Sequence, residues 1–78
     1  MQEHVESVPD TVNIMANGQQ RIIQHGSTIG DLLRELTIPP AHVVAQLNGS
    51  IVPRDTLNKV TLQQGDRLEL VTMVGGGR

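Results

Sequence analysis

The residues with the clearest chemical meaning are the three consecutive glycines Gly75, Gly76 and Gly77, which follow an apolar segment and precede Arg78. At an average glycine usage of about 7%, such a run is rare by chance. Glycine has no side chain to bury and loses the most backbone entropy when it is ordered, so a packed fold gains little from it. A side-chain-free segment is useful where a chain must enter a channel too narrow for a Cβ atom. We therefore hypothesise that this segment is the functional part of the protein; the alternative is a frayed terminus without a role.

The composition excludes several classes of function. The 78 residues include no Phe, Tyr or Trp, so the core must be aliphatic and no aromatic platform is available for stacking nucleic-acid bases. The formal net charge of −2 gives no electrostatic footprint for DNA or RNA. Because cysteine is absent, there is no disulfide, no thiolate nucleophile and no ligand for an iron–sulfur cluster. We expect no nucleic-acid partner.

Metal and membrane functions are disfavoured as well. His4, His25 and His42 lie far apart without metal-ligand spacing, so we interpret them as solvated loop residues. We expect no bound metal and no cofactor. No segment resembles a signal peptide, and no apolar run is long enough to cross a bilayer, so we predict a soluble protein of the cytoplasm.

The glycines need a rigid element to position them, and the periodicity predicts one domain over residues 11–74. Residues 1–10 are polar, acidic and aperiodic, so we expect a disordered leader there. Alternating apolar and polar residues over Thr11–Ala16 predict a half-buried strand. Asn17-Gly18 is typical of a type I′ turn because both residues tolerate positive φ. The return strand is expected over about Gln20–Gln24.

A helix is predicted after this hairpin. Thr28 is placed to cap the first free amides, and Asp31 follows three residues later, as in a capping box. Apolar residues then recur at helical spacing on one stripe, which consists of Ile29, Leu32, Leu33 and Leu36. Gly30 costs this helix about 1 kcal/mol relative to alanine. Because Pro39-Pro40 disfavours helical geometry before it, we expect a helix of about eight or nine residues that ends by Ile38.

Further strands are predicted in the second half of the chain. His42–Leu47 alternates like a strand, Asn48-Gly49 indicates a second tight turn, and Ser50–Val52 is a short return strand. Residues 55–59 are interpreted as irregular or as a short helical turn, with Leu57 directed inward.

The last strand is expected from Arg67 to about Met73. Leu68 and Leu70 would face the core, and Val71 would lie on the opposite face of this strand. A helix between strands on one side of a mixed sheet is an α+β layered architecture. Its compact form is a β-grasp, with one main helix against four or five strands and the first and last strands parallel at the centre. Residues 75–78 would then form a flexible tail on a rigid strand.

The sequence contains several motifs in a characteristic order. They are Asn17-Gly18, Thr28-x-x-Asp31-Leu32-Leu33, Leu47-Asn48-Gly49-x-x-Val52-Pro53-Arg54, Leu62-x-x-Gly65-Asp66-Arg67-Leu68-Glu69 and the glycine segment. Together they resemble the ThiS-type sulfur carrier proteins of thiamin biosynthesis, over roughly residues 11–77. The Asn-Gly-x-x-Val-Pro-Arg block favours this branch over the related small subunit of molybdopterin synthase, which usually has a proline-rich approach to its diglycine.

The resemblance implies a ubiquitin-like β-grasp protein that serves as a co-substrate and is not an enzyme. A C-terminal glycine carboxylate would attack the α-phosphate of ATP inside a ThiF-type adenylating enzyme. Sulfur from a cysteine desulfurase or rhodanese relay would then replace AMP, and the resulting thiocarboxylate would donate its sulfur to thiazole synthase. Gly77 is the expected sulfur-carrying residue, Gly76 is the alternative, and Gly75 is a spacer within the partner-binding segment.

The residues that lead into the glycines are candidates for partner binding. We expect Val71, Met73 and Val74 to form part of an apolar patch that docks the adenylating enzyme and thiazole synthase. The alternative is that a neighbouring strand or loop shields them. Arg54 and Arg67 could pair with acidic partner surfaces, but we interpret them as solvated surface charges.

One residue departs from the family pattern, which ends on glycine. We expect a peptidase to remove Arg78 before activation; an artificial extension is the alternative. Other functions also stay open at this point. They are a carrier for molybdopterin or amino-acid biosynthesis, a ubiquitin-like modifier that forms isopeptide bonds, and an interaction module with an incidental tail. A β-grasp ferredoxin is excluded because the chain has no cysteine.

Overall fold

Strands form where apolar and polar residues alternate in the sequence. The computed structural model describes residues 10–72, so the predicted tail over 75–78 and all of the predicted leader except Asp10 lie outside the described residues. The elements are β1 (Thr11–Ala16), β2 (Gln19–Gln24), α1 (Ile29–Glu35), β3 (Val43–Leu47), β4 (Ser50–Val52) and β5 (Arg67–Thr72), with short 3₁₀ helices η1 (Pro40–His42) and η2 (Arg54–Thr56). The carbonyl of Asp10 accepts a hydrogen bond from the amide of His25 at 2.9 Å and extends the first hairpin.

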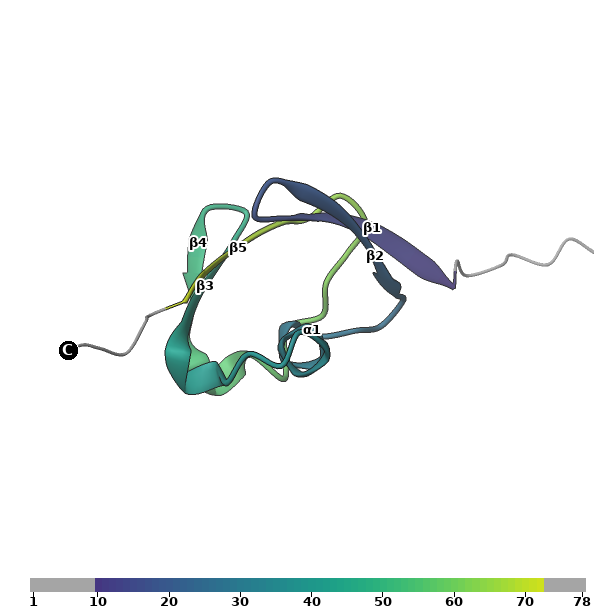
Figure 1. Cartoon of the computed structure of the whole chain (residues 1–78). Helices are drawn as coiled ribbons and strands as arrows, with labels where there is room; N and C mark the ends of the chain where they lie inside the picture. The colour runs from purple at the N-terminus through teal and green to yellow at the C-terminus, as the bar shows by residue number, and fades with distance from the viewer. Residues whose placement is uncertain (1–9, 73–78) are drawn as a thin grey trace, which may run out of the picture.

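The five strands form one mixed sheet in the order β2-β1-β5-β3-β4. β1 and β5 are parallel, and the other neighbours are antiparallel. Figure 1 shows α1 below the arch of the strands, so that it covers one face of the sheet. The predicted β-grasp is therefore confirmed, including the parallel first and last strands at its centre.

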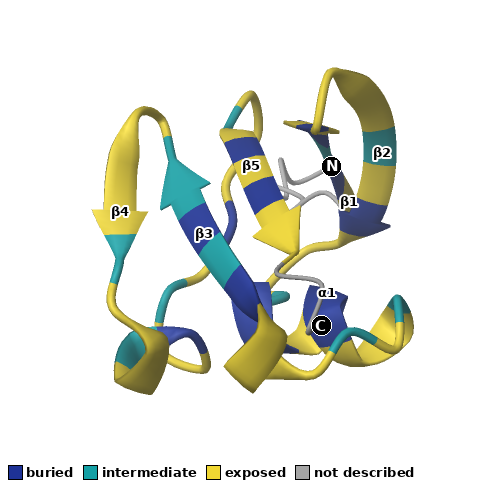
Figure 2. Cartoon of the chain, turned by 60° about the vertical axis from the view of Figure 1, so that its left-hand side comes forward, coloured by how far each residue is buried: buried dark blue, intermediate teal, exposed yellow. Residues whose placement is uncertain are grey.

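The face of the sheet toward α1 carries the core, and Figure 2 shows buried and exposed residues alternating along β5. The buried residues are Val12, Ile14, Ala16, Ile23, Ile29, Leu32, Leu33, Val43, Ala45, Leu57, Leu62, Leu68 and Leu70. All of them are aliphatic, as the composition predicts. Leu57 follows η2 and is only 3% exposed, which confirms its inward direction.

The first turn of α1 is fixed by the predicted capping box. The Thr28 hydroxyl accepts a hydrogen bond from the Asp31 amide at 3.1 Å, and the Asp31 carboxylate accepts one from the Thr28 amide at 3.0 Å. That backbone hydrogen bond from Thr28 is the largest cause that lowers the pKa of Asp31, and an ion pair with Arg34 acts in the same direction. Gly30 is buried because its backbone packs against Asn58, whose side chain would overlap an added Cβ atom.

The predicted length of the helix is wrong, because α1 ends at Glu35 with Leu36 as its C-cap. Thr37 adopts a left-handed conformation with φ of 56°. Its amide donates to the carbonyl of Arg34 at 3.1 Å, and the amide of Ile38 donates to the carbonyl of Leu33 at 2.9 Å. These two hydrogen bonds define a Schellman motif. The helix therefore stops at a left-handed residue, two positions before the first proline.

We predict that Thr37→Gly stabilises the protein. A Cβ atom in the left-handed conformation costs about 1–2 kcal/mol, whereas glycine is the preferred residue at this position of a Schellman motif. After the entropy that glycine adds to the unfolded state, we expect a net gain of about 0.5–1 kcal/mol in the free energy of unfolding. Urea denaturation measures it. Thr37→Ala, which keeps the Cβ atom, serves as the control, and equal stability of the two variants would contradict the explanation.

Candidate functional site

The face of the sheet away from α1 is uncovered by any described element, and the last strand runs along its middle. Arg67, Glu69 and Val71 lie on this open face of β5, as the alternation of the strand predicts. Val71 is 58% exposed, so within the described residues no strand or loop shields it. The other predicted partner-binding residues Met73, Val74 and Gly75, as well as Gly76, Gly77 and Arg78, lie outside the described residues.

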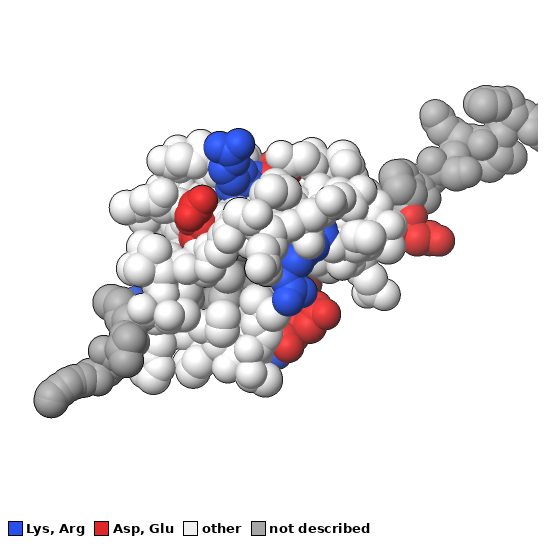
Figure 3. Space-filling view, turned by 45° about the horizontal axis from the view of Figure 1, so that its top comes forward, with Lys and Arg blue, Asp and Glu red and all other residues white. Residues whose placement is uncertain are grey.

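Two further apolar residues accompany Val71 on the open face. Val44 of β3 stands directly opposite Val71 in the antiparallel ladder. Ile51 of β4 is 65% exposed, and it lines a shallow hollow together with Val44. Figure 3 shows mostly uncharged surface next to the point where β5 ends. We call Val44, Ile51 and Val71 the open-face patch.

The sequence analysis missed Val44 and Ile51 for a clear reason. The alternation of His42–Leu47 predicts Val43, Ala45 and Leu47 on one face and therefore Val44 on the other, but it does not show which strand lies beside Val44; Ile51 lies in a strand of only three residues. The registers of β3 against β5 and of β4 against β3 place both residues on the face of Val71, because residues that pair directly across a ladder share a face.

The side chain of Asn17 holds β5 on one flank. β1 ends at Ala16, and its ladder with β5 covers only two residue pairs. Beyond it, the Asn17 carboxamide accepts a hydrogen bond from the amide of Leu70 at 2.7 Å and donates one to the carbonyl of Leu70 at 3.1 Å. A side chain thus replaces one rung of the parallel ladder, two residues before the described chain ends at Thr72.

Asn48 forms corresponding hydrogen bonds with β5 on the side of β3. Its amide donates to the carbonyl of Arg67 at 2.8 Å, and its side-chain oxygen accepts from the amide of Arg67 at 2.9 Å. Its side-chain nitrogen also donates to the carboxylate of Asp66 at 3.0 Å. Both turn asparagines have positive φ, as predicted, of 52° for Asn17 and 51° for Asn48. The sequence indicated the turns but not their contacts with β5.

The two candidate arginines have different surroundings. Arg54 is exposed, as expected of a surface charge, and its guanidinium donates to the carbonyl of Pro40 at 3.0 Å and more weakly to that of Ala41 at 3.5 Å. Arg54 therefore ties η2 to η1. Arg67 is exposed on the open face, and within residues 10–72 its side chain forms no ion pair.

The described residues offer no centre for catalysis by a metal. Among residues 10–72, no group of three His, Asp or Glu side chains is arranged to hold an ion, and the sequence has no cysteine. Within the same range no helix is long and apolar enough to cross a membrane. What the described site provides is an exposed apolar surface beside the end of a firmly held strand.

The fold and this site together define a β-grasp protein with a glycine segment after its central strand. Comparison with known sequences identifies the family of β-grasp proteins to which the chain belongs. The sequence model of the ThiS family matches residues 10–77, and the chain belongs to the ThiS family.

Two kinds of relatives are similar to this chain. The thiazole synthases of Paramagnetospirillum magneticum and Magnetococcus marinus are 33% and 34% identical over 66 and 67 residues, or 85% and 86% of this chain. The chain spans only 20% and 21% of their length. The crystal structure of the thiamine biosynthesis protein ThiS from Geobacter metallireducens superposes with a TM-score of 0.70 at 28% identity, covering 85% of this chain and all of that one. A solution structure of a thiamine biosynthesis protein from the same organism gives a TM-score of 0.70 at 26% identity, covering 86% and 90% of the two chains.

We predict that Asn17→Gly destabilises the protein by about 1–3 kcal/mol, because it leaves the amide and the carbonyl of Leu70 without their partners. Glycine accepts the positive φ without strain, so this variant isolates the loss of the side chain. Asn17→Asp should lower the free energy of unfolding as well, since a carboxylate oxygen would lie against the carbonyl oxygen of Leu70 and cannot donate a hydrogen bond to it. Urea denaturation and hydrogen exchange at the Leu70 amide provide the measurements. Wild-type stability of Asn17→Gly would show that the contact is unimportant.

Proposed function

We propose that this chain is a sulfur carrier of thiamin biosynthesis, and that it acts as a co-substrate and not as a catalyst. The observation that carries the proposal is the match to the ThiS family over residues 10–77, which includes Gly76 and Gly77. The relatives named thiazole synthase support the thiazole branch of the pathway. The absence of cysteine from the sequence is compatible with this role, because the sulfur is carried on a main-chain carboxyl group.

The proposed chemistry starts with activation of the Gly77 carboxylate. A carboxylate is a poor electrophile, so its oxygen first attacks the α-phosphate of ATP in a ThiF-type adenylating enzyme, and pyrophosphate leaves. The terminal sulfur of a donor persulfide then attacks the acyl carbon and displaces AMP. A thiol cleaves the resulting S–S bond and is oxidised to a disulfide, which leaves the thiocarboxylate on Gly77. Thiazole synthase is the proposed acceptor of this sulfur.

Glycine suits this chemistry on steric grounds. The reacting carbonyl carbon must be held within about 3–3.5 Å of its attacking group, and a Cβ atom beside it would narrow the channel that admits it. Gly77 has a free carboxylate only after the peptide bond to Arg78 is cleaved. We therefore propose that a peptidase exposes Gly77 before adenylation.

The open-face patch is the proposed docking surface for the adenylating enzyme and for thiazole synthase. Val71 is exposed and lies one residue before the end of β5, so a partner that contacts it is well placed to receive the segment that follows. A few well-packed and fully desolvated residues supply most of the binding energy in protein interfaces, and the contacts around them exclude water. Met73, Val74 and Gly75 are proposed to extend this surface.

We predict that sulfur loading depends on a chain that ends at Gly77. Forms that end at Arg78, Gly77 and Gly76 are incubated with ATP, a ThiF-type adenylating enzyme and a persulfide donor, and intact mass is measured. Only the form ending at Gly77 should exchange one carboxylate oxygen for sulfur. The form ending at Gly76 tests the alternative acceptor.

Two results would contradict this proposal. One is a sulfur-loaded species that retains Arg78. The other is the formation of isopeptide bonds with lysine residues in place of a thiocarboxylate, which would favour a protein modifier. Protein purified from its native cell should likewise end at Gly77.

We predict that Val71→Asp lowers kcat/KM for adenylation about tenfold or more. In the complex with the adenylating enzyme, the substitution would bury a charge where the wild-type chain buries an apolar side chain. Met15→Asp is the matched control, since Met15 is a large apolar residue on the same face, 39% exposed and opposite Arg67 at the far end of β5. It should change kcat/KM less than about twofold. Circular dichroism verifies that both variants are folded. Equal losses in the two variants would argue against the open-face patch.

A further inference from the structure

The edge of the sheet far from β4 is formed by β2, which presents backbone groups that are unpaired among residues 10–72. Along β2, the backbone N–H and C=O groups of successive residues point alternately toward β1 and away from it. The hydrogen bond from the amide of His25 to the carbonyl of Asp10 shows which residues point toward β1. Arg21 and Ile23 therefore direct their backbone groups toward β1. Gln20, Ile22 and Gln24 direct theirs away from the sheet, although the carbonyl of Gln24 accepts the amide of Ser27 at 3.1 Å.

Within the described residues, this edge has little of the usual protection against strand pairing. Natural edge strands are commonly very short or contain proline, charged side chains or a bulge, which prevents another strand from adding to them. Of these features β2 has only the charge of Arg21. β2 has six residues, QQRIIQ, and pairs regularly with β1 throughout its length. Ile22 is 67% exposed on the open face of the sheet.

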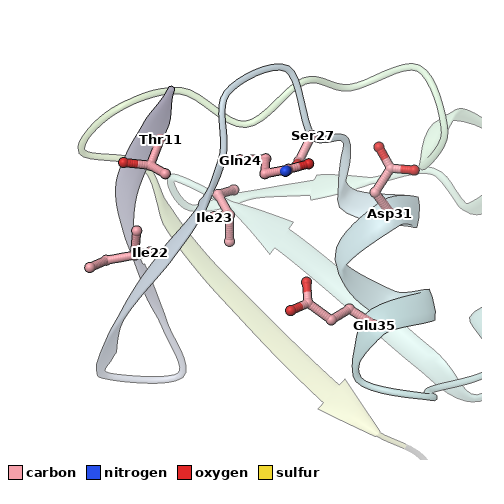
Figure 4. A pocket seen from close by; sticks show the side chains of 7 residues that line it. All are labelled: Thr11, Ile22, Ile23, Gln24, Ser27, Asp31 and Glu35. Atoms are coloured by element: carbon pink, nitrogen blue, oxygen red, sulfur yellow. The ribbon is translucent and has the colours of Figure 1, made fainter. Parts of the chain in front are cut away.

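A groove lies between β2 and α1, below this edge. Figure 4 shows Glu35 and Asp31 on the helix side of the groove and Ile23 on the strand side. Asp31 forms an ion pair with Arg34, whereas Glu35 forms none within the described residues. Glu35 is thus an available carboxylate in the groove.

We propose that a second copy of this chain pairs with the β2 edge and forms a two-fold symmetric dimer with a continuous sheet. In an antiparallel arrangement centred on Ile22, this residue faces its own symmetry mate. The amide and the carbonyl of Ile22 then bond to those of the second copy. The amide of Gln24 bonds to the carbonyl of the second copy's Gln20, and the symmetric bond forms as well.

The same register makes the side chains self-complementary. Directly paired residues share a face, so the two Ile22 side chains meet on the open face. On the helix face, the second copy's Arg21 stands beside Ile23, at the mouth of the groove that contains Glu35. Arg21 is only partly buried in the single chain, so it is free to reach across. Each copy thus contributes an arginine to the acidic groove of the other.

This dimer is compatible with the carrier role but does not rest on it. β1 separates β2 from β5, and the open-face patch lies on β3, β4 and β5. One short strand per copy buries far less than the roughly 1,600 Å² of a standard interface. The dimer should accordingly be weak and depend on protein concentration.

Cysteine cross-linking tests the register directly, because the chain has no cysteine of its own. Paired residues of this kind have Cα atoms about 5.5 Å apart, within the range that a disulfide bridges. Ile22→Cys should form a disulfide-linked dimer under mild oxidation, at a rate at least about tenfold above that of Ile51→Cys. Ile51 is the matched control, since its exposed fraction of 65% is close to the 67% of Ile22 and it lies on the opposite edge strand.

A charge exchange tests the contact between Arg21 and Glu35. Sedimentation velocity over a range of concentrations should show dimer formation by the wild-type chain, and loss of dimer in Arg21→Glu and in Glu35→Arg. The double variant should restore it. Circular dichroism confirms that each variant is folded.

Three outcomes would overturn the proposal. The first is equal cross-linking of the two cysteine variants, and the second is a monomer at every concentration. The third is that the β2 edge binds an unrelated extended peptide but no second copy of the chain.

Discussion

The structure depends on hydrogen bonds from two asparagine side chains, Asn17 and Asn48, to the backbone of β5 on its two sides. β1 is too short to pair with β5 along its length, and β3 meets β5 only up to Leu47. Asn17 and Asn48 complete the two ladders with their carboxamides. Each asparagine also occupies the left-handed position of a tight turn, which few other residues adopt without cost. Turn formation and strand fastening are therefore joined in the same two residues.

This arrangement explains how a small domain without aromatic residues holds its central strand firmly. The aliphatic core binds only the helix-facing side of β5, through Leu68 and Leu70. The hydrogen bonds of the two asparagines act in the plane of the sheet and leave the open face uncovered. An apolar residue such as Val71 therefore stays exposed on a rigid support. The proposed carrier role makes use of this combination, because a partner can contact the exposed face of β5 without displacing the strand from the sheet.

Membership of the ThiS family and the matches to thiazole synthases carry different information. The family match covers residues 10–77, nearly the whole chain. The thiazole synthases match over only about a fifth of their own length, so their catalytic activity is not transferred to this chain. The β-grasp domain is a separate unit with its own core, and the proposed carrier role rests on its family and on the glycine segment.

The sequence by itself determined the local structure, because local structure depends on neighbours in the chain. Alternation predicted the strands, Asn-Gly pairs predicted the turns, and Thr28 with Asp31 predicted the start of α1. α1 has 7 residues and is shorter than predicted, since Thr37 takes a conformation that its side chain disfavours and packing of Ile38 on the core compensates. Only the tertiary structure decided which flank of β5 each asparagine holds, and that Val44 and Ile51 join Val71 on one face. Those relations depend on register between distant strands, and a register is fixed only when the whole sheet has formed.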